Sequence, residues 1–347
     1  MSDTSSAVRS PALSYRGAGV DTEAKTRLLA NLAETIRATH GTSVAAGMGA
    51  FAGALRLSLG DTLVFATVDG VGTKTLLARQ AGRDRVIGWD AVAHCANDLV
   101  SGGARPAAFL DYVAMGRLVP AVVEEVVEGA AEGCRALGVP ILGGETAEMP
   151  GVYVADAYDV VGIMMGLAPP EELITGSTIE PGDRLIGLAS SGLHTNGYSL
   201  VRRVLEETGI RLDERPSDLE STVADALLAP HRCYAPAVLS LFDRVRPKGI
   251  AHITGGGLSD NLIRILPEGC RARLERSWPE PPIFGFLRRA GNIPEDDMIS
   301  TFNLGIGMVL VTAPRDAGSA IAHLEASGIP AFQIGEIMAG ARGVDIQ

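Results

Sequence analysis

Five carboxylates in the first half of the chain are the residues best suited to chemistry, because they follow or interrupt apolar segments. They are Asp69, Asp98, Asp111, Glu145 and Glu148. Convergent carboxylates without cysteine or histidine partners favour Mg²⁺, a hard ion that takes oxygen ligands and bridges to substrate phosphates. The alternative interpretation is that each carboxylate is a separate cap or turn residue, and spacing along the chain leaves both interpretations open.

Asp69 belongs to the most informative stretch, residues 65–74, which reads FATVDGVGTK. An apolar, β-prone run that stops at Asp-Gly-x-Gly places a carboxylate at the rim of a sheet, and its glycines let a phosphate approach the backbone. The common phosphate loop is excluded, because Thr73 separates Gly72 from Lys74 where that motif has glycine directly before lysine. A plain strand-turn-helix junction is the competing interpretation.

His194 is the histidine that the sequence favours for proton transfer. It lies in SSGLHTN, residues 190–196, between the end of a predicted strand and the start of a predicted helix. Such a turn can aim an imidazole into a cleft, where its pKa suits proton transfer. His94 and His252 have settings typical of surface or core residues, and no Gly-x-Ser-x-Gly elbow near 190–191 supports a serine hydrolase.

The composition is that of an acidic globular protein. The chain has 347 residues, a formal net charge of −11 and 46% apolar residues, which favours two domains and excludes a disordered or nucleic-acid-coating protein. An acidic protein that binds a nucleotide needs local compensation from a divalent metal or from backbone N–H groups at helix starts. We therefore expect a small-molecule ligand and no nucleic acid.

Cysteine spacing and hydropathy predict a cytoplasmic protein without membrane attachment. The four cysteines are widely spaced and form no Cys-x-x-Cys pair, which indicates reduced thiols. Residues 1–13, expected to form a mobile tail, lack the apolar core of a signal peptide. No run approaches the roughly 18 apolar residues of a membrane helix.

Hydrophobic periodicity predicts the elements that position these residues. In the first half we expect helices at 22–40, 92–99 and 120–137, and strands at 55–59, 63–68, 86–90, 107–115, 139–142 and 160–167. Asp90 is expected to cap the helix that carries Asp98. A Gly-x-Gly-x-x-Ala match at 47–52 is not a dinucleotide fingerprint, because a helix precedes it and a strand follows it.

A stretch rich in proline, glycine and acidic residues, 168–183, predicts a domain linker with the boundary near residue 172. Beyond it strands and helices alternate, which predicts an α/β layer. The expected strands are 184–189, 250–253, 306–311 and 332–337, and the expected helices begin near 200, 260 and 316.

Taken together, the motifs resemble those of one enzyme family. In chain order they are SYRGAGVD at 14–21, DGVGTK at 69–74, ND at 97–98, GGETAEMPG at 143–151, SSGLHTN at 190–196, TGGG at 254–257 and TFN at 301–303. From about residue 14 to its end, the chain resembles the phosphoribosylformylglycinamidine cyclo-ligases of purine biosynthesis, also called aminoimidazole ribonucleotide synthetases. The GGETAEMPG string is far more specific than any single glycine loop, and it favours convergence of the carboxylates over separate caps.

The resemblance implies a ring closure that depends on ATP and Mg²⁺. ATP phosphorylates the formyl amide oxygen of formylglycinamidine ribonucleotide, the amidine nitrogen attacks the activated carbon, and aminoimidazole ribonucleotide, ADP and phosphate are released. The implied fold is a two-domain α+β or α/β protein, with an ATP-binding and dimerisation domain at 14–172 and a C-terminal α/β domain at 173–347. The first domains of two subunits are expected to join their sheets into a barrel, with ATP sites across the homodimer.

The resemblance also implies roles for individual residues. The implied metal ligands are Asp69, Asp98 and Glu145. The implied ATP site adds Gly47, Gly49, Gly53, Gly70, Gly72, Thr73, Lys74 and Asn97. The implied substrate site comprises Glu145, Thr146, His194, Asn196, Thr254, Gly255 and Gly256. The catalytic candidates are Lys74, as a phosphate contact, His194, as proton shuttle or charge stabiliser, and Asn196.

A few positions depart from the family pattern. Arg16 stands where the family has lysine, His94 where it commonly has methionine, and Ala50 and Ala52 where it often has glycine. An arginine fork is not equivalent to a lysine ammonium at a nucleotide. Among related activities, selenophosphate synthetase normally needs a reactive cysteine near the N-terminus, whereas the first cysteine here is Cys95, and the amidotransferase of the pathway is usually much longer. A non-catalytic nucleotide-binding protein is disfavoured, because the polar residues of every motif are present.

Overall fold

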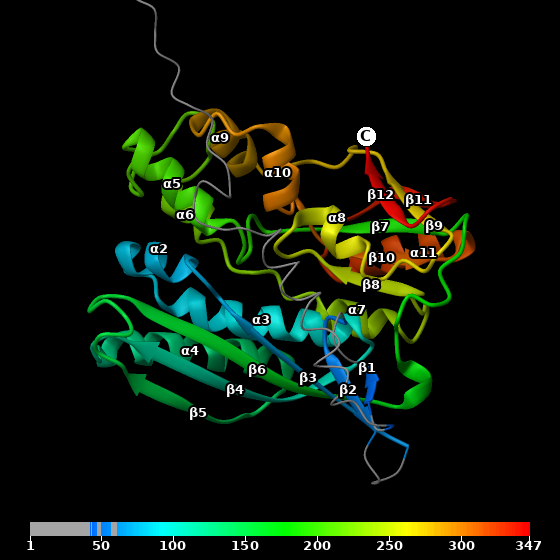
Figure 1. The fold of residues 1–347 in the computed structure, drawn as a ribbon, viewed down its shortest axis with the longest axis horizontal. Coiled ribbons are helices and arrows are strands. Elements are labelled where there is room, and N and C mark those ends of the chain that lie inside the picture. Colours follow the sequence, from blue (N-terminus) through cyan, green and yellow to red (C-terminus); the bar gives the residue numbers. More distant parts are fainter. Residues whose placement is uncertain (1–41, 43, 47–49, 57–60) are drawn as a thin grey trace, which may run out of the picture.

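The computed structural model describes residues 42, 44–46, 50–56 and 61–347. The predicted tail at 1–13, the predicted helix at 22–40, and Gly47 and Gly49 lie outside the described residues. The described part contains two six-stranded sheets, which occupy the lower and upper halves of Figure 1, with helices packed on them. Mixed sheets combined with helices make this an α+β fold.

The first sheet has the strand order β1-β2-β3-β6-β4-β5. Its strands are β1 (Val44–Ala46), β2 (Gly53–Arg56), β3 (Leu63–Gly70), β4 (Arg105–Met115), β5 (Ile141–Glu148) and β6 (Tyr158–Ala168). Neighbouring strands are antiparallel except β4 and β5, which are parallel and are connected by helix α4 (Pro120–Leu137). The predicted hairpin before residue 70 is confirmed by the β2–β3 pair, in which Gly53 lies opposite Ala66.

Helix α3 (Arg85–Ser101) lies beside α4 on one face of this sheet. The predicted ends of α4 are confirmed: Pro120 begins it, and Gly138, in the left-handed conformation, follows its last residue. The prediction for α3 was wrong at its start, because residues 86–90 are helical and Asp90 lies inside the helix. Nearly every residue from Ile87 to Ser101 is buried, and a helix that is buried all round lacks the amphipathic period that distinguishes it from a strand.

The opposite face of the first sheet carries exposed apolar side chains. Val68 on β3 is 63% exposed, and Met165 and Leu167 on β6 are 40% and 44% exposed. The β3–β6 register pairs Ala66 with Met165 and Val64 with Leu167, which puts these side chains on one face together with Val68. Contiguous exposed apolar side chains of this kind mark interaction surfaces.

The second sheet has the strand order β12-β9-β11-β7-β10-β8. Its strands are β7 (Arg184–Ala189), β8 (Gly249–His252), β9 (Cys270–Leu274), β10 (Ile306–Thr312), β11 (Ala331–Ala339) and β12 (Gly343–Ile346). Among the described pairs of this sheet only β9 and β12 are parallel. The predicted α/β layer is therefore corrected to a mostly antiparallel α+β layer. Alternation of strands and helices along the chain does not determine strand direction when strands pair with neighbours that are distant in sequence.

Seven further helices accompany the second sheet, and a short helix precedes α3. The seven are α5 (Tyr198–Thr208), α6 (Val223–Leu227), α7 (Ala235–Leu241), α8 (Gly257–Leu262), α9 (Pro282–Ala290), α10 (Glu295–Thr301) and α11 (Pro314–Ala326), and the short one is α2 (Lys74–Ala81). A 3₁₀ turn at Pro170–Glu172 lies in the predicted linker. Within the described residues no helix is both long and apolar enough to cross a membrane.

Helix α3 joins the two halves of the molecule. It packs on β3 and β6 of the first sheet and also contacts β8 and α7 of the second half. One buried apolar cluster accordingly runs from Phe65 and Leu99 in the first half to Tyr234 and Leu310 in the second. Side chains on α3 are therefore positioned by both halves at once.

Candidate functional site

Asp69 and Asp98 meet where β3 and α3 face each other. Asp69 is the next-to-last residue of β3, and Asp98 lies in the last turns of α3. Thr67, on the same face of β3, donates its hydroxyl hydrogen to Asp98 Oδ2 at 3.2 Å. His94, one helical turn before Asp98, connects the carboxylates: its Nε2 is 2.9 Å from Asp69 Oδ2 and 3.9 Å from Asp98 Oδ2. The structure thus brings these two predicted metal ligands together.

Asp69, Asp98 and His94 form a charge-balanced group at the edge of the core. The Asp69 side chain is 45% exposed, whereas those of His94 and Asp98 are buried. Partial burial acts to raise the pKa of Asp69, but the facing His94 outweighs it and lowers that pKa to about 2. Burial acts to lower the pKa of His94, but Asp69, and then Asp98, raise it to about 9. At neutral pH His94 is therefore a cation between two carboxylates.

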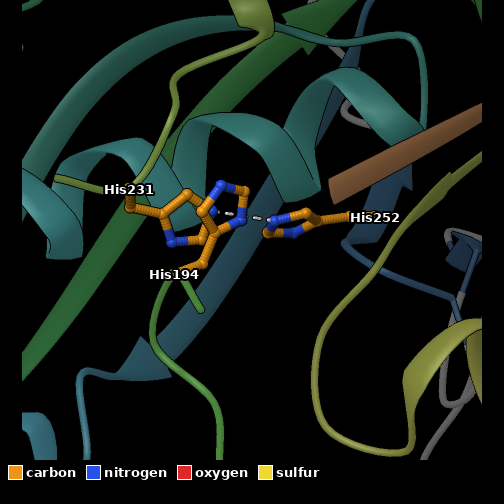
Figure 2. Close-up of side chains that lie close together, drawn as sticks. All are labelled: His194, His231 and His252. Atoms are coloured by element: carbon orange, nitrogen blue, oxygen red, sulfur yellow. Dashed lines mark hydrogen bonds between the residues drawn. The ribbon is translucent and has the colours of Figure 1, made fainter. Parts of the chain in front are cut away.

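Three further histidines continue from Asp98 into the second half. His252, the last residue of β8, places Nδ1 2.8 Å from Asp98 Oδ1. Figure 2 shows its Nε2 facing Nε2 of His231, at 3.1 Å, and the His231 ring lying against His194. The rings of His231 and His194 are stacked, with centroids 4.0 Å apart and an angle of 18° between their planes. All three side chains are buried.

Sequence reasoning missed part of this histidine cluster. His94 precedes Asp98 by four residues in a helix, a spacing that puts two side chains on one helix face and was an available signal. His252 ends a strand directly before a glycine-rich turn, and this position was a weaker signal. His231 lies in the loop sequence PHRCY at 230–234, which carries no recognisable motif.

His194 combines an uncommon backbone conformation with a neutral ring. Its φ of 61° lies in the left-handed region that residues other than glycine rarely adopt. The ring accepts a hydrogen bond at Nε2 from the backbone N–H of Ser191, at 3.3 Å, so its proton is on Nδ1, which has no partner among the described residues. Burial first, and then the neighbouring His252 and Lys74, lower the pKa of His194 well below its usual value. A neutral Nδ1–H donor suits the expected role of charge stabiliser better than that of proton donor.

Lys74 is buried and fully paired, which favours a structural role over the expected contact with phosphate. The ammonium donates to Asp90 Oδ2 at 2.6 Å, to the carbonyl of His194 at 3.0 Å and to the carbonyl of Ala229 at 3.0 Å. These acceptors use all three of its N–H groups, and the side chain has no exposed surface. Lys74 instead holds the loop of His194 against α3, with Asp90 as its counter-ion.

Asn97, predicted as a nucleotide contact, makes two structural hydrogen bonds. It is buried in α3, where its Nδ2 donates to the carbonyl of Arg232 at 2.9 Å. Its Oδ1 accepts the backbone N–H of Tyr234 at 2.7 Å. The amide therefore uses both ends to fasten the loop that carries His231 to α3.

The turn between β3 and α2 lies beside the start of α5. The backbone N–H of Gly70 donates to Asp69 Oδ1 at 2.8 Å. Gly72 has a φ of 69°, which a glycine adopts without strain. Thr73 Oγ1 lies 3.2 Å from Ser199 Oγ. These predicted nucleotide contacts thus lie at a junction between the halves.

The predicted substrate residues after β8 lie next to Asn196. Asn261 holds their turn, because its Nδ2 donates to the carbonyls of Thr254 and Gly255, each at 3.3 Å. Gly256 has a φ of 94° and immediately precedes α8. A Cβ atom added to Gly255 would lie 3.3 Å from Asn196 Oδ1, so the two predicted segments are neighbours.

Glu145 and Thr146 lie away from this site. The register pairs Glu145 on β5 with Tyr112 on β4, on the exposed face of the sheet, whereas Asp69 is on the helix-covered face. Strand β5 is also three positions from β3 in the sheet, about 14 Å at the usual strand spacing. Within one protomer the structure therefore does not bring Glu145 together with Asp69 and Asp98.

Both halves match a family of known domains. The N-terminal domain of the family described as AIR synthase related protein matches residues 49–168, and its C-terminal domain matches residues 180–346. Thiamine-monophosphate kinase from Stenotrophomonas maltophilia has a TM-score of 0.63 at 19% identity, over 91% of this chain and 95% of that one. Thiamine monophosphate kinase from Aquifex aeolicus has a TM-score of 0.63 at 15% identity, over 93% and 97%. At these identities the likeness concerns the fold alone.

Sequence relatives give a narrower assignment. A phosphoribosylformylglycinamidine cyclo-ligase of Geobacillus thermodenitrificans is 46% identical over 332 residues, which are 94% of this chain and 96% of that protein. The protein of that name from Citrifermentans bemidjiense is 44% identical over 342 residues, 96% of this chain and 98% of the relative. Since identity at this level extends over nearly the whole chain and both domains match in order, the chain belongs to the phosphoribosylformylglycinamidine cyclo-ligase family of enzymes.

Proposed function

We propose that this protein catalyses the ATP-dependent cyclisation of formylglycinamidine ribonucleotide to aminoimidazole ribonucleotide, with release of ADP and phosphate. The observation that carries the proposal is the 46% identity to a phosphoribosylformylglycinamidine cyclo-ligase along 94% of the chain. The approach of Asp69 and Asp98 at the rim of the first sheet supports it, because phosphoryl transfer needs carboxylates that hold a metal ion against phosphate.

The chemistry activates an amide oxygen as a leaving group. The γ-phosphoryl group of ATP passes to the formyl amide oxygen of the substrate, and ADP leaves. The amidine nitrogen then forms a bond to the same carbon and loses a proton, while the carbon–oxygen bond breaks and phosphate departs. The protein's contribution is mainly positioning and stabilisation of charge.

Asp69 and Asp98 are the residues that would hold Mg²⁺. Their donor atoms fit a divalent cation, because both are carboxylates, one half exposed and the other buried, and an oxygen of each lies within 4 Å of the same atom, His94 Nε2. Mg²⁺, when bound, supplies neutralisation of the triphosphate charge. Asp69, as the more exposed of the pair, is the carboxylate nearer to an incoming nucleotide.

His194 and Asn196 act on the substrate side. His194 donates its Nδ1–H toward the oxygen that develops charge, and the hydrogen bond from Ser191 to Nε2 keeps the ring in this tautomer. Lys74 acts as a positioning residue, because it binds the carbonyl of His194. Asn196, beside Gly255, contacts the ribonucleotide together with the turn after β8.

The protein assembles as a homodimer through the exposed face of the first sheet, which joins the partner's sheet in a barrel. Val68, Met165 and Leu167 support this, because a sheet with helices on one side leaves such side chains uncovered on the other. Glu145 lies on the same face. In the dimer its carboxylate contributes to the site of the partner subunit and not to its own.

The decisive assay is direct. The purified protein is incubated with ATP, Mg²⁺ and formylglycinamidine ribonucleotide, and aminoimidazole ribonucleotide and ADP are separated by chromatography. We expect both products in equal amounts, with ADP release dependent on the ribonucleotide. Absence of the product from folded, ATP-binding protein would refute the proposed activity.

A further inference from the structure

The histidines around Asp98 provide nitrogen ligands where a Mg²⁺ site needs only oxygen. We propose that His94, Asp98 and His252, with Asp69 as a fourth ligand, bind a transition-metal divalent cation such as Zn²⁺ or Co²⁺ in preference to Mg²⁺. Ligand atoms of the first three residues lie within 4.8 Å of one another, and all three are buried. The inference rests on the proposed function in one respect, the assignment of Asp69 and Asp98 as the carboxylates that face ATP.

Three separations between the candidate ligand atoms can be compared with those of a tetrahedral site, and Asp98 faces His252 through Oδ1 and His94 through Oδ2. Metal–ligand distances of about 2.0–2.1 Å place neighbouring ligand atoms about 3.3 Å apart. The observed separations are 2.8 Å from His252 Nδ1 to Asp98 Oδ1, 2.9 Å from His94 Nε2 to Asp69 Oδ2, and 3.9 Å from His94 Nε2 to Asp98 Oδ2. Each differs from the tetrahedral value by about 0.4–0.6 Å.

The second nitrogen of each histidine is already anchored. His94 Nδ1 lies 3.0 Å from Thr195 Oγ1, and His252 Nε2 lies 3.1 Å from His231 Nε2. Asp98 Oδ2 accepts a hydrogen bond from Thr67. Metal-binding histidines almost always use their other nitrogen in this way, because the hydrogen bond fixes the ring orientation and the tautomer.

His94 Nε2 is the candidate ligand atom that faces both carboxylates. It is buried and has no hydrogen-bond partner among the described residues, although Asp69 Oδ2 is 2.9 Å away in an ion pair. A metal ion bound between the carboxylates would take the place of the proton on this nitrogen, because imidazole binds a metal in its deprotonated form.

A second group of histidines, His194, His231 and His252, is less suited to a metal ion. Their ligand atoms also lie within 4.8 Å of one another. Figure 2 shows the rings of His194 and His231 lying nearly parallel, and they are stacked at 4.0 Å. An imidazole binds a metal in the plane of its ring, and two stacked rings cannot both direct their in-plane lone pairs to one ion.

The donor set determines which cation binds. Imidazole nitrogen suits Zn²⁺ and Co²⁺, whereas Mg²⁺ prefers oxygen ligands and retains several waters. A site with two imidazoles and two carboxylates therefore favours the transition ion. The two histidines thereby influence which cation occupies the carboxylates that face ATP.

Calorimetric titration of the nucleotide-free protein tests the preference. Zn²⁺ is expected to bind at one site per chain and more tightly than Mg²⁺, and Co²⁺ is expected to give the intense visible absorption of a four-coordinate site. X-ray absorption at the zinc edge of the wild-type protein is expected to show scattering from two imidazoles. Zn²⁺ affinity no greater than that for Mg²⁺, or a zinc spectrum without imidazole scattering, would overturn the proposal.

Three variants locate the ion. His94→Gln is expected to weaken Zn²⁺ binding at least about tenfold. His323→Gln is the matched control, because His323 contacts Ser240 and belongs to neither histidine group, so its loss should leave the affinity unchanged. His194→Gln should also leave it unchanged. If His194→Gln abolishes Zn²⁺ binding while His94→Gln does not, the ion lies in the other histidine group and the proposal is wrong.

Thermal unfolding verifies that each variant is folded. The zinc X-ray absorption spectrum of the wild-type protein tests the proposal even if a variant does not fold. None of these measurements contains ATP or ribonucleotide. Failure of the proposed enzymatic activity and failure of the metal preference are therefore separate results.

Discussion

Replacing Lys74 with methionine separates the two roles considered for this lysine, a phosphate contact and a buried ion pair. The ammonium has no exposed surface and donates to Asp90, to the carbonyl of His194 and to the carbonyl of Ala229. Methionine fills a similar volume without the charge. Lys74→Met is therefore expected to destabilise the protein strongly, because it leaves the Asp90 carboxylate buried without a counter-ion.

The magnitude follows from what remains around Asp90. After the substitution the carboxylate keeps the backbone N–H of His231, at 2.8 Å, as its other described hydrogen bond. Removal of one partner of a buried ion pair costs about 3–5 kcal/mol of the free energy of unfolding. With a urea m-value of about 3 kcal/mol per M, the unfolding midpoint falls by about 1–1.7 M.

Urea unfolding followed by circular dichroism, with ATP binding measured by calorimetry, tests this reasoning. The double variant Lys74→Met/Asp90→Asn should regain part of the lost stability, because the uncompensated charge is gone. An unchanged urea midpoint for Lys74→Met, together with a large loss of ATP affinity that Asp90→Asn does not repair, would refute the ion-pair role and restore the phosphate contact.

Four further predictions concern the metal site, a helix cap and its acidic residue, and the sheet face. Asp98→Asn should weaken ATP binding that depends on Mg²⁺, since it removes a negative ligand; equal ATP affinity at all Mg²⁺ concentrations would limit Asp98 to its hydrogen bonds with Thr67 and His252. Thr222→Ala should cost about 1 kcal/mol of unfolding free energy by thermal denaturation, because it breaks the capping box of α6. Hydrogen bonding from Thr222, and then from Arg83, lowers the pKa of Asp225 to about 2 from its usual 3.8. The ionised carboxylate therefore stabilises the fold at pH values above 3.8, and this contribution is lost as the pH falls from 3.8 toward 2. The stability difference between wild type and Asp225→Asn should accordingly shrink on acidification, and a difference that stays constant would contradict the assigned pairing. Val68→Arg should convert the dimer to a monomer in analytical sedimentation, whereas Val127→Arg, at an exposed position of α4, should leave the dimer intact. If each single variant remains a dimer, the interface uses another face.

Local signals were sufficient for several elements. Pro120 and Gly138 delimit α4, because proline is favoured in the first turn of a helix and glycine adopts the left-handed conformation that ends one. The strand at 184–189 was predicted at its observed bounds from its apolar residues and the turns beside them. In both cases the information lies within a few residues of the boundary.

The start of α3 could not be predicted in the same way. Asp90 follows an apolar run and resembles a helix cap in sequence, yet it lies inside a helix that is buried by the first sheet and by the second half. Its carboxylate is satisfied by Lys74 and by the backbone of His231, which is distant in sequence. Tertiary contacts therefore outweighed the local capping preference.

The sequence by itself determined the family, the order of the motifs and the identity of the carboxylates, because these depend on residue types and spacing along the chain. Only the tertiary structure decided which charged groups meet. It buries Lys74 against Asp90, separates Glu145 from Asp69 by sheet register, and assembles four histidines around Asp98 from α3, β8 and two loops. The physical reason is that burial and pairing of charge depend on distances between segments far apart in the chain, which neither propensity nor local spacing contains.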